Sequence, residues 1–276
     1  MISISTLRSS RRLILVLNMW FLFREAPVLA AADTSLVPGE RLTYQIYWSF
    51  IPAARATLEI APNGENSVKG AVYHFTMTAR TLPVLDMIYK YRERIDSYVA
   101  AGVQYSLRYK RVQESSHPRD ILVDFDWNKG RVQYRNFGKS SEPIRVRPGT
   151  LDPLSALYYI RSQPMTERFV FERWVTDGKK LSLAKASFVQ KETLTIHGKN
   201  YQTIKVEPDL RDVKGVFEKS PGAKLFIWLT DDSRKLPVKV KSKVKVGSFI
   251  AELIEEESVI PSTSGQEDHL PAKSPR

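Results

Sequence analysis

Carboxylate side chains make the strongest case for catalysis in this sequence of 276 residues. Asp124 and Asp126 alternate with apolar residues in one segment, and Asp231 and Asp232 follow an apolar segment that ends at Leu229. Two facing carboxylates can cleave a glycosidic bond, one as acid and the other as base or nucleophile. The alternative for each pair is structural, because Asp231 and Asp232 are typical of a hairpin turn and Asp124 and Asp126 of a solvated strand face. We favour the structural interpretation.

Other catalytic patterns are missing from the sequence. The four histidines (His74, His117, His197 and His269) are isolated and have no metal-site spacing. There is no Gly-x-Ser-x-Gly elbow, no glycine-rich phosphate loop and no cysteine. The sequence therefore predicts no catalytic residue, no metal and no cofactor, and it favours binding over catalysis.

A row of lysines is the first candidate binding site. Lys239, Lys241, Lys243 and Lys245 occupy alternate positions, with mostly valine between them. A strand here would present all four ammonium groups on one face, where they could hold anionic headgroups or acidic glycans. The alternative is that the lysines protect an edge strand from pairing with other chains.

Aromatic side chains supply the second candidate site, an apolar pocket. Nine aromatic residues and one leucine are expected to face inward from strands and from a helix: Tyr44, Trp48, Phe75, Tyr105, Tyr109, Phe125, Trp127, Leu154, Tyr158 and Trp228. A curved sheet of this width can leave room for one small ligand, and a single short helix would cover its concave face incompletely. The alternative is that these side chains are ordinary core.

The elements that position these residues are mainly strands. Apolar residues alternate with polar ones over residues 42–48, 103–109 and 121–127, as in strands with one buried face. Residues 225–229 are apolar on both faces, so we expect them to lie centrally in the sheet. The predicted fold is mainly β: a single curved antiparallel sheet, or half-barrel, with a short helix packed in or on its concave face.

Two segments depart from the strand pattern. Residues 152–161 begin with an aspartate suited to an N-cap and a proline suited to the first helical position, and Leu154, Leu157 and Tyr158 follow at helical spacing. We predict a short amphipathic helix there. Residues 82–89 are apolar, and we expect a short helix or turn that forms a lip or lid.

The N-terminus has the order of features found in a secretory signal. Three arginines precede an apolar run over residues 13–23, and alanines follow at 30–32. We therefore predict a signal peptide over residues 1–32 and a periplasmic protein without an integral span after cleavage, since the run is short and no second one follows. Arg24 and Glu25 are unusual in a cleaved signal, so an uncleaved N-terminal anchor is the alternative.

The rest of the chain is predicted to form one β-rich domain over residues 33–257, followed by a disordered tail over 258–276. Loss of residues 1–32 would remove four arginines and one glutamate, which lowers the formal charge from +12 to +9. A surface this basic favours anionic partners such as lipid headgroups or acidic glycans. Export makes nucleic acid the least fitting of the anionic partners.

Three stretches carry a resemblance to a known family. Residues 38–48 (PGERLTYQIYW), 151–161 (LDPLSALYYIR) and 227–238 (IWLTDDSRKLPV) resemble the exported bacterial family called domain of unknown function 3108, in order and spacing. The resemblance implies a periplasmic location. By a looser similarity it implies a half-barrel wrapped around a helix, as in lipoprotein carriers and lipid-binding domains of the LolA and LolB type.

These observations lead to two functional hypotheses. The first is a non-enzymatic periplasmic protein that holds an acyl or other amphiphilic ligand, such as a lipid, in an apolar pocket with a basic rim. The second is an envelope interaction module that binds a protein partner or an acidic glycan through its basic strand face. A glycan-processing enzyme that uses the four aspartates ranks third.

Overall fold

Fifteen strands in a single sheet and three short helical segments make up the part of the chain that the computed structural model describes. The described residues are 35–62, 68–209, 223–244 and 247–258, all within one unit, Asp33–Arg276. The expected signal segment 1–32, Lys245 and all but the first residue of the expected tail 258–276 lie outside the described residues.

The strands in chain order are β1 (Arg41–Trp48), β2 (Ile51–Ile60), β3 (Tyr73–Thr81), β4 (Arg92–Val99), β5 (Ser106–Glu114), β6 (Arg119–Asp126), β7 (Arg131–Asn136), β8 (Lys139–Ser140), β9 (Ile144–Arg145), β10 (Val170–Thr176), β11 (Leu181–Ile196), β12 (Lys199–Pro208), β13 (Lys224–Thr230), β14 (Pro237–Val244) and β15 (Gly247–Glu257). The helical segments are α1 (Pro83–Asp86), the 3₁₀ turn η1 (Ala101–Val103) and α2 (Pro153–Ser162).

The sheet is antiparallel and open. Its order is β10-β11-β12-β13-β14-β15-β1-β2-β3-β4-β5-β6-β7-β8, and β9 pairs with β7 beside that path. Most strands that follow one another in sequence pair with each other, and the last strand, β15, pairs with the first, β1. This arrangement confirms the predicted fold class. It also confirms the central position expected for residues 225–229, because β13 lies between β12 and β14.

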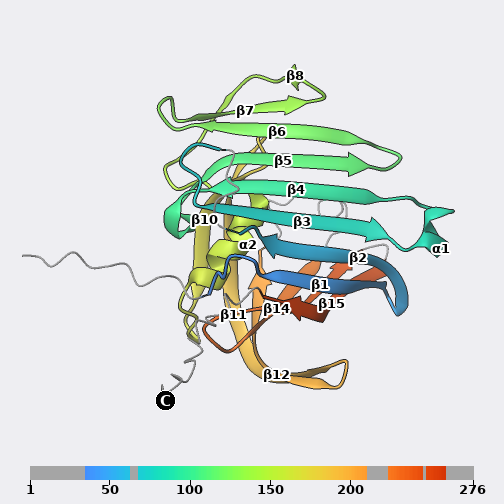
Figure 1. Ribbon diagram of the computed structural model, residues 1–276. Coiled ribbons are helices and arrows are strands. Elements are labelled where there is room, and N and C mark those ends of the chain that lie inside the picture. Colours follow the sequence, from blue (N-terminus) through green and yellow to red (C-terminus); the bar gives the residue numbers. More distant parts are fainter. Residues whose placement is uncertain (1–34, 63–67, 210–222, 245–246, 259–276) are drawn as a thin grey trace, which may run out of the picture. The chain divides into compact units, whose positions relative to one another are not determined.

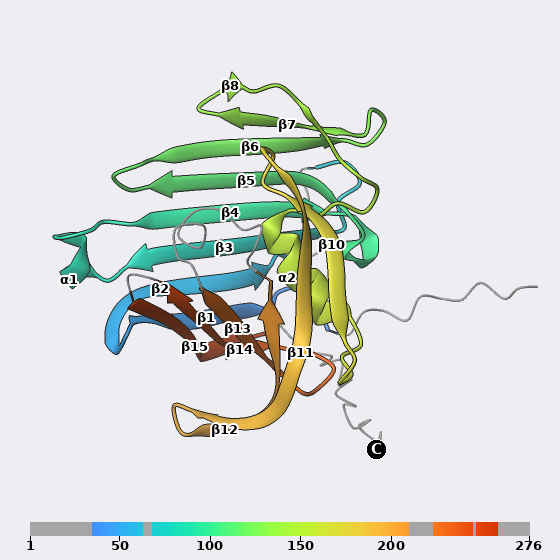
Figure 2. The same ribbon diagram turned by 180° about the vertical axis from the view of Figure 1, so that it is seen from behind.

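The helix α2 defines two faces of the sheet. It contacts β3 and β4 on one side and β10, one end strand of the open sheet, on the other (Figures 1 and 2). Successive residues in a strand point to opposite faces. We call the face that packs on α2 the inner face and the opposite one the outer face.

The predicted helix is confirmed, and its sequence explains where it begins. The Asp152 carboxylate accepts the backbone N–H groups of Leu154 and Ser155 at 2.9 and 3.0 Å, and the Ser155 hydroxyl accepts the N–H of Asp152 at 3.1 Å. Pro153 follows the cap, where its fixed φ suits the first turn and no N–H is needed. This reciprocal capping box satisfies donors that a helix start leaves free. The segment 82–89 contains α1, as expected, but only one turn is helical.

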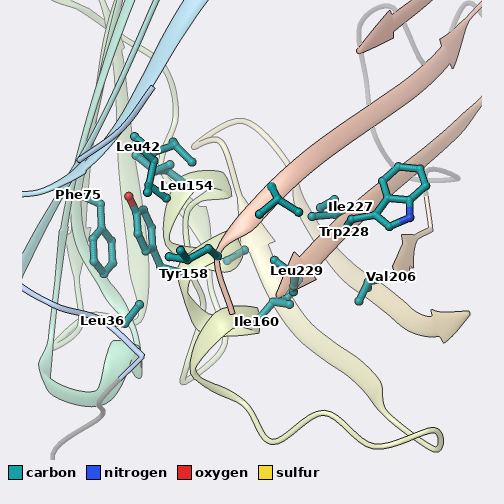
Figure 3. Close-up of a cluster of buried hydrophobic side chains, with 14 of the residues drawn as sticks. Leu36, Leu42, Phe75, Leu154, Tyr158, Ile160, Val206, Ile227, Trp228 and Leu229 are labelled. Carbon is teal, nitrogen blue, oxygen red and sulfur yellow. The ribbon is translucent and has the colours of Figure 1, made fainter. Parts of the chain in front are cut away.

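The inner face is packed with apolar side chains around α2 (Figure 3). Tyr158 of α2 is fully buried and stacks on Phe75 of β3, with 3.8 Å between ring centroids. Its hydroxyl donates to the carbonyl of Glu59 at 3.2 Å, so the polar end of the ring is also satisfied. A second cluster, built around Val123 and Tyr134, fills the inner face of β5, β6 and β7.

Candidate functional site

The ten residues predicted to line one apolar pocket lie in different surroundings. Tyr44, Phe75, Leu154, Tyr158 and Trp228 are buried in the larger core cluster, and Tyr109 and Phe125 in the smaller one. Tyr105 and Trp127 are half-buried, with rings 5.1 Å apart, and Trp48 is 47% exposed. None of the ten lines the hollows of about 510, 450 and 410 Å³ that lie on the described part of the surface.

The expectation of an incompletely covered concave face was wrong around Tyr158, because the helix is held close to the sheet. Asp152 receives hydrogen bonds from Ser97 of β4 and Ser106 of β5, both at 2.6 Å. These bonds bring the start of α2 against the inner face, and the Tyr158 ring then fills the space beside Phe75. Close packing of this kind leaves no room for an acyl chain between the two rings.

Trp228 points away from the predicted pocket. It stands opposite Lys205 on β12 and Lys239 on β14, whereas its neighbour Ile227 stands opposite inner-face residues. On the outer face its indole N–H donates to the Glu192 carboxylate at 2.6 Å, and the Lys205 ammonium lies 5.0 Å from its ring centroid. The side chains of Lys205 and Glu192 thus cover the outer side of β13, which explains how a strand that is apolar on both faces avoids water.

The predicted lysine row lies on the outer face, but not at an edge. Lys239, Lys241 and Lys243 belong to β14, which is paired on both sides, so the edge-protection interpretation is wrong. Lys239 donates to Glu252 at 2.7 Å, while Lys241 and Lys243 are exposed. Lys245 lies outside the described residues. Whether these lysines contact an anionic partner stays a prediction.

A second, denser set of cations lies on the same outer face, as the register between the strands shows. Directly opposed residues in antiparallel strands share a face. Starting from Lys239, the opposed residues across β15, β1, β2, β3 and β4 are Glu252, Gln45, Arg55, Arg80 and Arg92. Three arginines therefore stand side by side on three adjacent strands, a consequence of register that spacing along the sequence does not reveal.

A hollow of about 510 Å³ lies over these strands. Five arginines line it, and we call it the arginine groove: Arg41, Arg55, Arg80, Arg92 and Arg94. The other lining residues are Thr43, Ala56, Thr57, Thr78, Ala79, Glu93, Val112, Glu114, Glu255 and Glu257. Thr57 and Thr78 share a hydrogen bond of 2.6 Å in the row beside Arg55 and Arg80, so hydroxyl groups adjoin the guanidinium groups.

Two of the five arginines are unpaired. Arg41 contacts Glu59 at 3.0 Å, Arg92 donates to Asp86 at 2.9 Å and Arg94 contacts Asp96 at 2.7 Å. Arg55 and Arg80 are both exposed and, within the described ranges, neither has a hydrogen bond or an ion pair.

The opposition of Arg55 and Arg80 has an electrostatic cost. Like charges directly opposite each other in a sheet repel and destabilise the pair. The carboxylates of the groove do not relieve this repulsion. Glu255 and Glu257 lie on β15, two strands from Arg55, Glu93 is paired with Arg111 at 2.5 Å, and Glu114 is 3.7 Å from Lys90. The centre of the groove is therefore positive and its two ends are acidic. An anion between the two guanidinium groups would remove the repulsion.

A polar cluster beside the groove involves His74 of β3. Its Nε2 lies 2.9 Å from Asp96, and its ring stacks on Tyr98 with 4.2 Å between centroids. Burial works to raise the pKa of Asp96, but hydrogen bonds from His74 and Arg94 outweigh it and lower that pKa to about 2. Asp96 therefore stays ionised and holds Arg94 at the wall of the groove.

The lowered pKa of Asp96 predicts an acid-sensitive contribution to stability. A carboxyl whose pKa is lower in the folded state than its unfolded value near 3.9 stabilises fully above that value and loses the contribution as pH falls toward 2. We expect the free energy of unfolding of the wild type to fall by about 2 kcal/mol more than that of Asp96→Asn between pH 5 and pH 2. Urea titrations across this range test it, and parallel pH profiles for both proteins would contradict it.

Two buried polar clusters on the inner face escaped the sequence analysis. Arg161 and Glu40 are fully buried and form an ion pair at 2.8 Å, in which Arg161 Nη2 donates a hydrogen bond to Glu40 Oε2 at 3.0 Å. Arg234 approaches Glu40 at 3.1 Å. The second cluster is Asp152 with its serines. Arg161 follows Leu154 at the spacing of the helix's apolar face. A charged residue at such a position is the sequence signal that could have indicated the first cluster.

The four aspartates considered for glycosidic cleavage lie on separate elements. Asp124 on β6 contacts Arg108 at 2.6 Å and also Arg135, while Asp126 lies 3.7 Å from Lys129. Asp232 accepts the N–H groups of Arg234 and Lys235 at 3.0 Å in the turn after β13, as expected of a hairpin aspartate, and Asp231 contacts Lys191 at 2.7 Å. The four side chains are thus held by separate cations and by a hairpin turn, and β6 and β13 are not neighbours in the sheet.

Comparisons with known proteins agree with the predicted family and fold. The family model described as "Protein of unknown function (DUF3108)" matches residues 43–254. Among solved structures, a beta-barrel-like protein of the domain of unknown function DUF1849 from Brucella abortus is similar, with a TM-score of 0.52 and 10% sequence identity over 81% of this chain and 98% of that one. A search of curated proteins found no match. At this identity the structural likeness concerns the fold alone.

Proposed function

We propose that this chain, which belongs to the DUF3108 family of proteins of unknown function, is a non-enzymatic binding protein that holds an anionic group in the arginine groove. One observation carries the proposal. Arg55 and Arg80 are opposed on adjacent strands, exposed and, among the residues that the structure describes, without a carboxylate partner, and they lie in a hollow of about 510 Å³. The volume lies within the range of about 300–1,000 Å³ typical of ligand sites.

The chemistry of the groove suits phosphate or carboxylate. A guanidinium group offers a planar fork of donors that matches both anions, and two such forks side by side can hold one anion from two directions. The hydroxyls of Thr57 and Thr78 lie in the next row and can supply further donors. The acidic ends, at Glu114 and at Glu255 and Glu257, would limit the charged part of a ligand to the centre.

We place this activity in the bacterial envelope. The arginine-rich start, apolar run and alanines of residues 1–32 support export to the periplasm. Acidic glycans and phosphorylated lipids are available there as anionic partners, whereas nucleic acid is not. Of the two hypotheses formed from the sequence, the interaction module fits this geometry better than the amphiphile carrier. The stacked and buried Tyr158 and Phe75 occupy the space that a carrier would need for an acyl chain.

The test compares two arginine pairs of equal charge. We expect Arg55→Gln combined with Arg80→Gln to weaken the binding of a soluble oligouronate or a glycerol phosphate oligomer by about tenfold or more, because charge-assisted hydrogen bonds are lost. Isothermal titration calorimetry at fixed ionic strength measures the loss, and the two probes distinguish carboxylate from phosphate recognition.

The matched control is Arg131→Gln combined with Arg145→Gln. Arg131 and Arg145 are also opposed and exposed arginines on adjacent strands, but neither lines the groove. The control removes the same charge, so we expect its affinity to stay within about twofold of the wild type. An equal loss for both double variants would mean that the probes respond to net charge alone, and the proposed site would be wrong.

A further inference from the structure

Exposed apolar side chains gather at one end of the sheet. Thirteen large apolar residues are exposed within the described part of the chain, and eight of them belong to two adjacent connections or to the strand ends beside them: Trp48, Phe50, Ile51, Val84, Met87, Ile88, Tyr89 and Phe249. The three most exposed are Met87 at 86%, Phe50 at 85% and Ile88 at 84%. We call these eight residues the apolar tip. Apolar residues concentrated in this way mark an interaction surface, whereas scattered ones do not.

The two connections of the apolar tip are neighbours. Phe50 lies in the turn between β1 and β2, and α1 with Met87 and Ile88 connects β3 to β4. Since β2 pairs with β3, both leave the sheet at the same end, and the N–H of Leu82 before α1 donates to the carbonyl of Ala53 on β2 at 2.9 Å (Figure 1). Trp48 stands opposite both Ile51 and Phe249, which places β15 at this end as well.

The α1 connection is held in place by polar contacts at its base. Hydrogen bonds from Arg92 and then Thr81 lower the pKa of Asp86 to about 2, so its carboxylate stays charged. The N–H groups of Ile88 and Tyr89 donate to the carbonyl of Leu85 at 3.0 and 2.7 Å. Met87 and Ile88 are therefore presented on a fixed turn, and their exposure does not come from a loose loop.

Side-chain types differ between the apolar tip and the groove beside it. Within the tip, Met87, Ile88 and Phe50 are the most exposed, and the amphipathic rings of Trp48 and Tyr89 are about half exposed. Arg80 ends the outer face of β3 one residue before Thr81, and Arg55 stands opposite it, so cations adjoin this end of the sheet. A bilayer surface favours apolar residues and the rings of Trp and Tyr together with cations, since rings settle at the headgroup level and cations meet anionic phosphates.

We propose that the apolar tip docks this protein on an anionic lipid bilayer and brings phosphate headgroups to Arg55 and Arg80 in the arginine groove. The proposal rests on the proposed function and deepens it, because it names lipid headgroups as the source of the anion. Charge complementarity selects a bilayer over an apolar protein surface, since Arg55 and Arg80, near this end of the sheet, have no ion-pair partner among the described residues. The β1–β2 turn and the α1 connection can also enter a fluid bilayer independently of each other, whereas a protein partner would need a surface that matches both.

The first experiment measures vesicle binding of the full chain by flotation. The probes are phosphatidylcholine vesicles with and without phosphatidylglycerol. We expect binding to the phosphatidylglycerol vesicles, and a loss of about tenfold or more in partitioning for Met87→Ser combined with Ile88→Ser, because two apolar side chains no longer enter the bilayer. The control is Val72→Ser combined with Val170→Ser, two residues that are 45% and 63% exposed; Val72 precedes β3 at the end of that strand opposite the tip. It should partition like the wild type.

A second readout tests the location of contact independently of residues 1–32, which all variants share. Brominated lipids quench tryptophans that reach the bilayer, so wild-type quenching should fall substantially in Trp48→Phe. Unchanged quenching in Trp48→Phe, or equal flotation of the tip and control variants, would overturn docking through the tip.

The outcomes also separate this proposal from the one on which it rests. If the arginine groove binds soluble anions but the protein ignores phosphatidylglycerol vesicles, docking on a bilayer is wrong while the proposed function stands, and a protein partner becomes the occupant of the tip. If flotation depends on the tip but Arg55→Gln with Arg80→Gln leaves both vesicle and soluble-anion binding unchanged, the groove is not the headgroup site and the proposed function falls.

Discussion

Replacing Arg161 with methionine is expected to lower the free energy of unfolding by about 3–5 kcal/mol, the range for breaking a buried ion pair by removing one partner. The substitution leaves Glu40 as a fully buried carboxylate, with only the half-buried Arg234 at 3.1 Å to compensate its charge. It also removes hydrogen bonds from Arg161 to the carbonyls of Ser35 and Arg234, at 3.2 and 3.3 Å. Urea denaturation followed by tryptophan fluorescence measures the loss.

Two further variants show whether charge is the cause. Glu40→Gln added to Arg161→Met removes the stranded carboxylate and should recover part of the lost stability. Arg168→Met is the control, because Arg168 is an exposed arginine shortly after α2, and it should change stability by less than about 0.5 kcal/mol. If Arg161→Met unfolds with nearly wild-type stability, the buried pair does not hold α2 in place.

Replacing Asp152 with alanine should cost about 3 kcal/mol or more. One N-cap accounts for about 1 kcal/mol, and each buried donor left without an acceptor adds about 1–3 kcal/mol. The carboxylate accepts from the hydroxyls of Ser97, Ser106 and Ser155 and from two backbone N–H groups, all of them buried. Asp152→Asn keeps one carbonyl oxygen and should fall between the wild type and Asp152→Ala.

The control for Asp152 is another aspartate that accepts backbone N–H groups. Asp177 accepts those of Lys179 and Lys180 at 2.9 and 3.2 Å, but in an exposed turn where water can replace it. Asp177→Ala should therefore cost less than about 1 kcal/mol. Equal losses for the two alanine variants would mean that burial of the Asp152 cluster adds nothing to its local role in capping.

The three stretches that resemble the DUF3108 family meet in the buried clusters. Glu40 comes from residues 38–48, Arg161 from 151–161 and Arg234 from 227–238, and their side chains converge at the end of α2. These stretches therefore contribute to the assembly of the fold, where a short helix must be joined to strands from distant parts of the chain. They do not line the arginine groove apart from Arg41 and Thr43.

The fold could be predicted because strands and helix starts are set by residues that lie close together in the sequence. Alternation of apolar residues identified strands, and Asp152 with Pro153 identified the start of α2. Partner choice between strands is not local, so Lys239 to Lys243 were as consistent with an edge strand as with a central one. Only the pairing of β14 with both β13 and β15 decided between them.

The sequence predicted the kind of candidate site but not its position in the fold. Sequence indicated an anionic partner and a basic strand face, but the row of Arg55, Arg80 and Arg92 depends on register between hairpins whose lengths fix which residues oppose each other. The apolar pocket failed for a different reason. Aromatic residues on inner faces leave a cavity or fill it depending on how closely α2 approaches, and buried hydrogen bonds from Ser97 and Ser106 set that distance.

Nuclear magnetic resonance of the arginine side chains tests the central claim most directly, because it reports each guanidinium group separately. We expect the Nε–Hε signals of Arg55 and Arg80 to shift and saturate together as glycerol phosphate is added, while those of Arg131 and Arg145 stay in place. Shifts spread evenly over all exposed arginines, or no saturation at Arg55 and Arg80, would contradict a specific anion site on the outer face of this sheet.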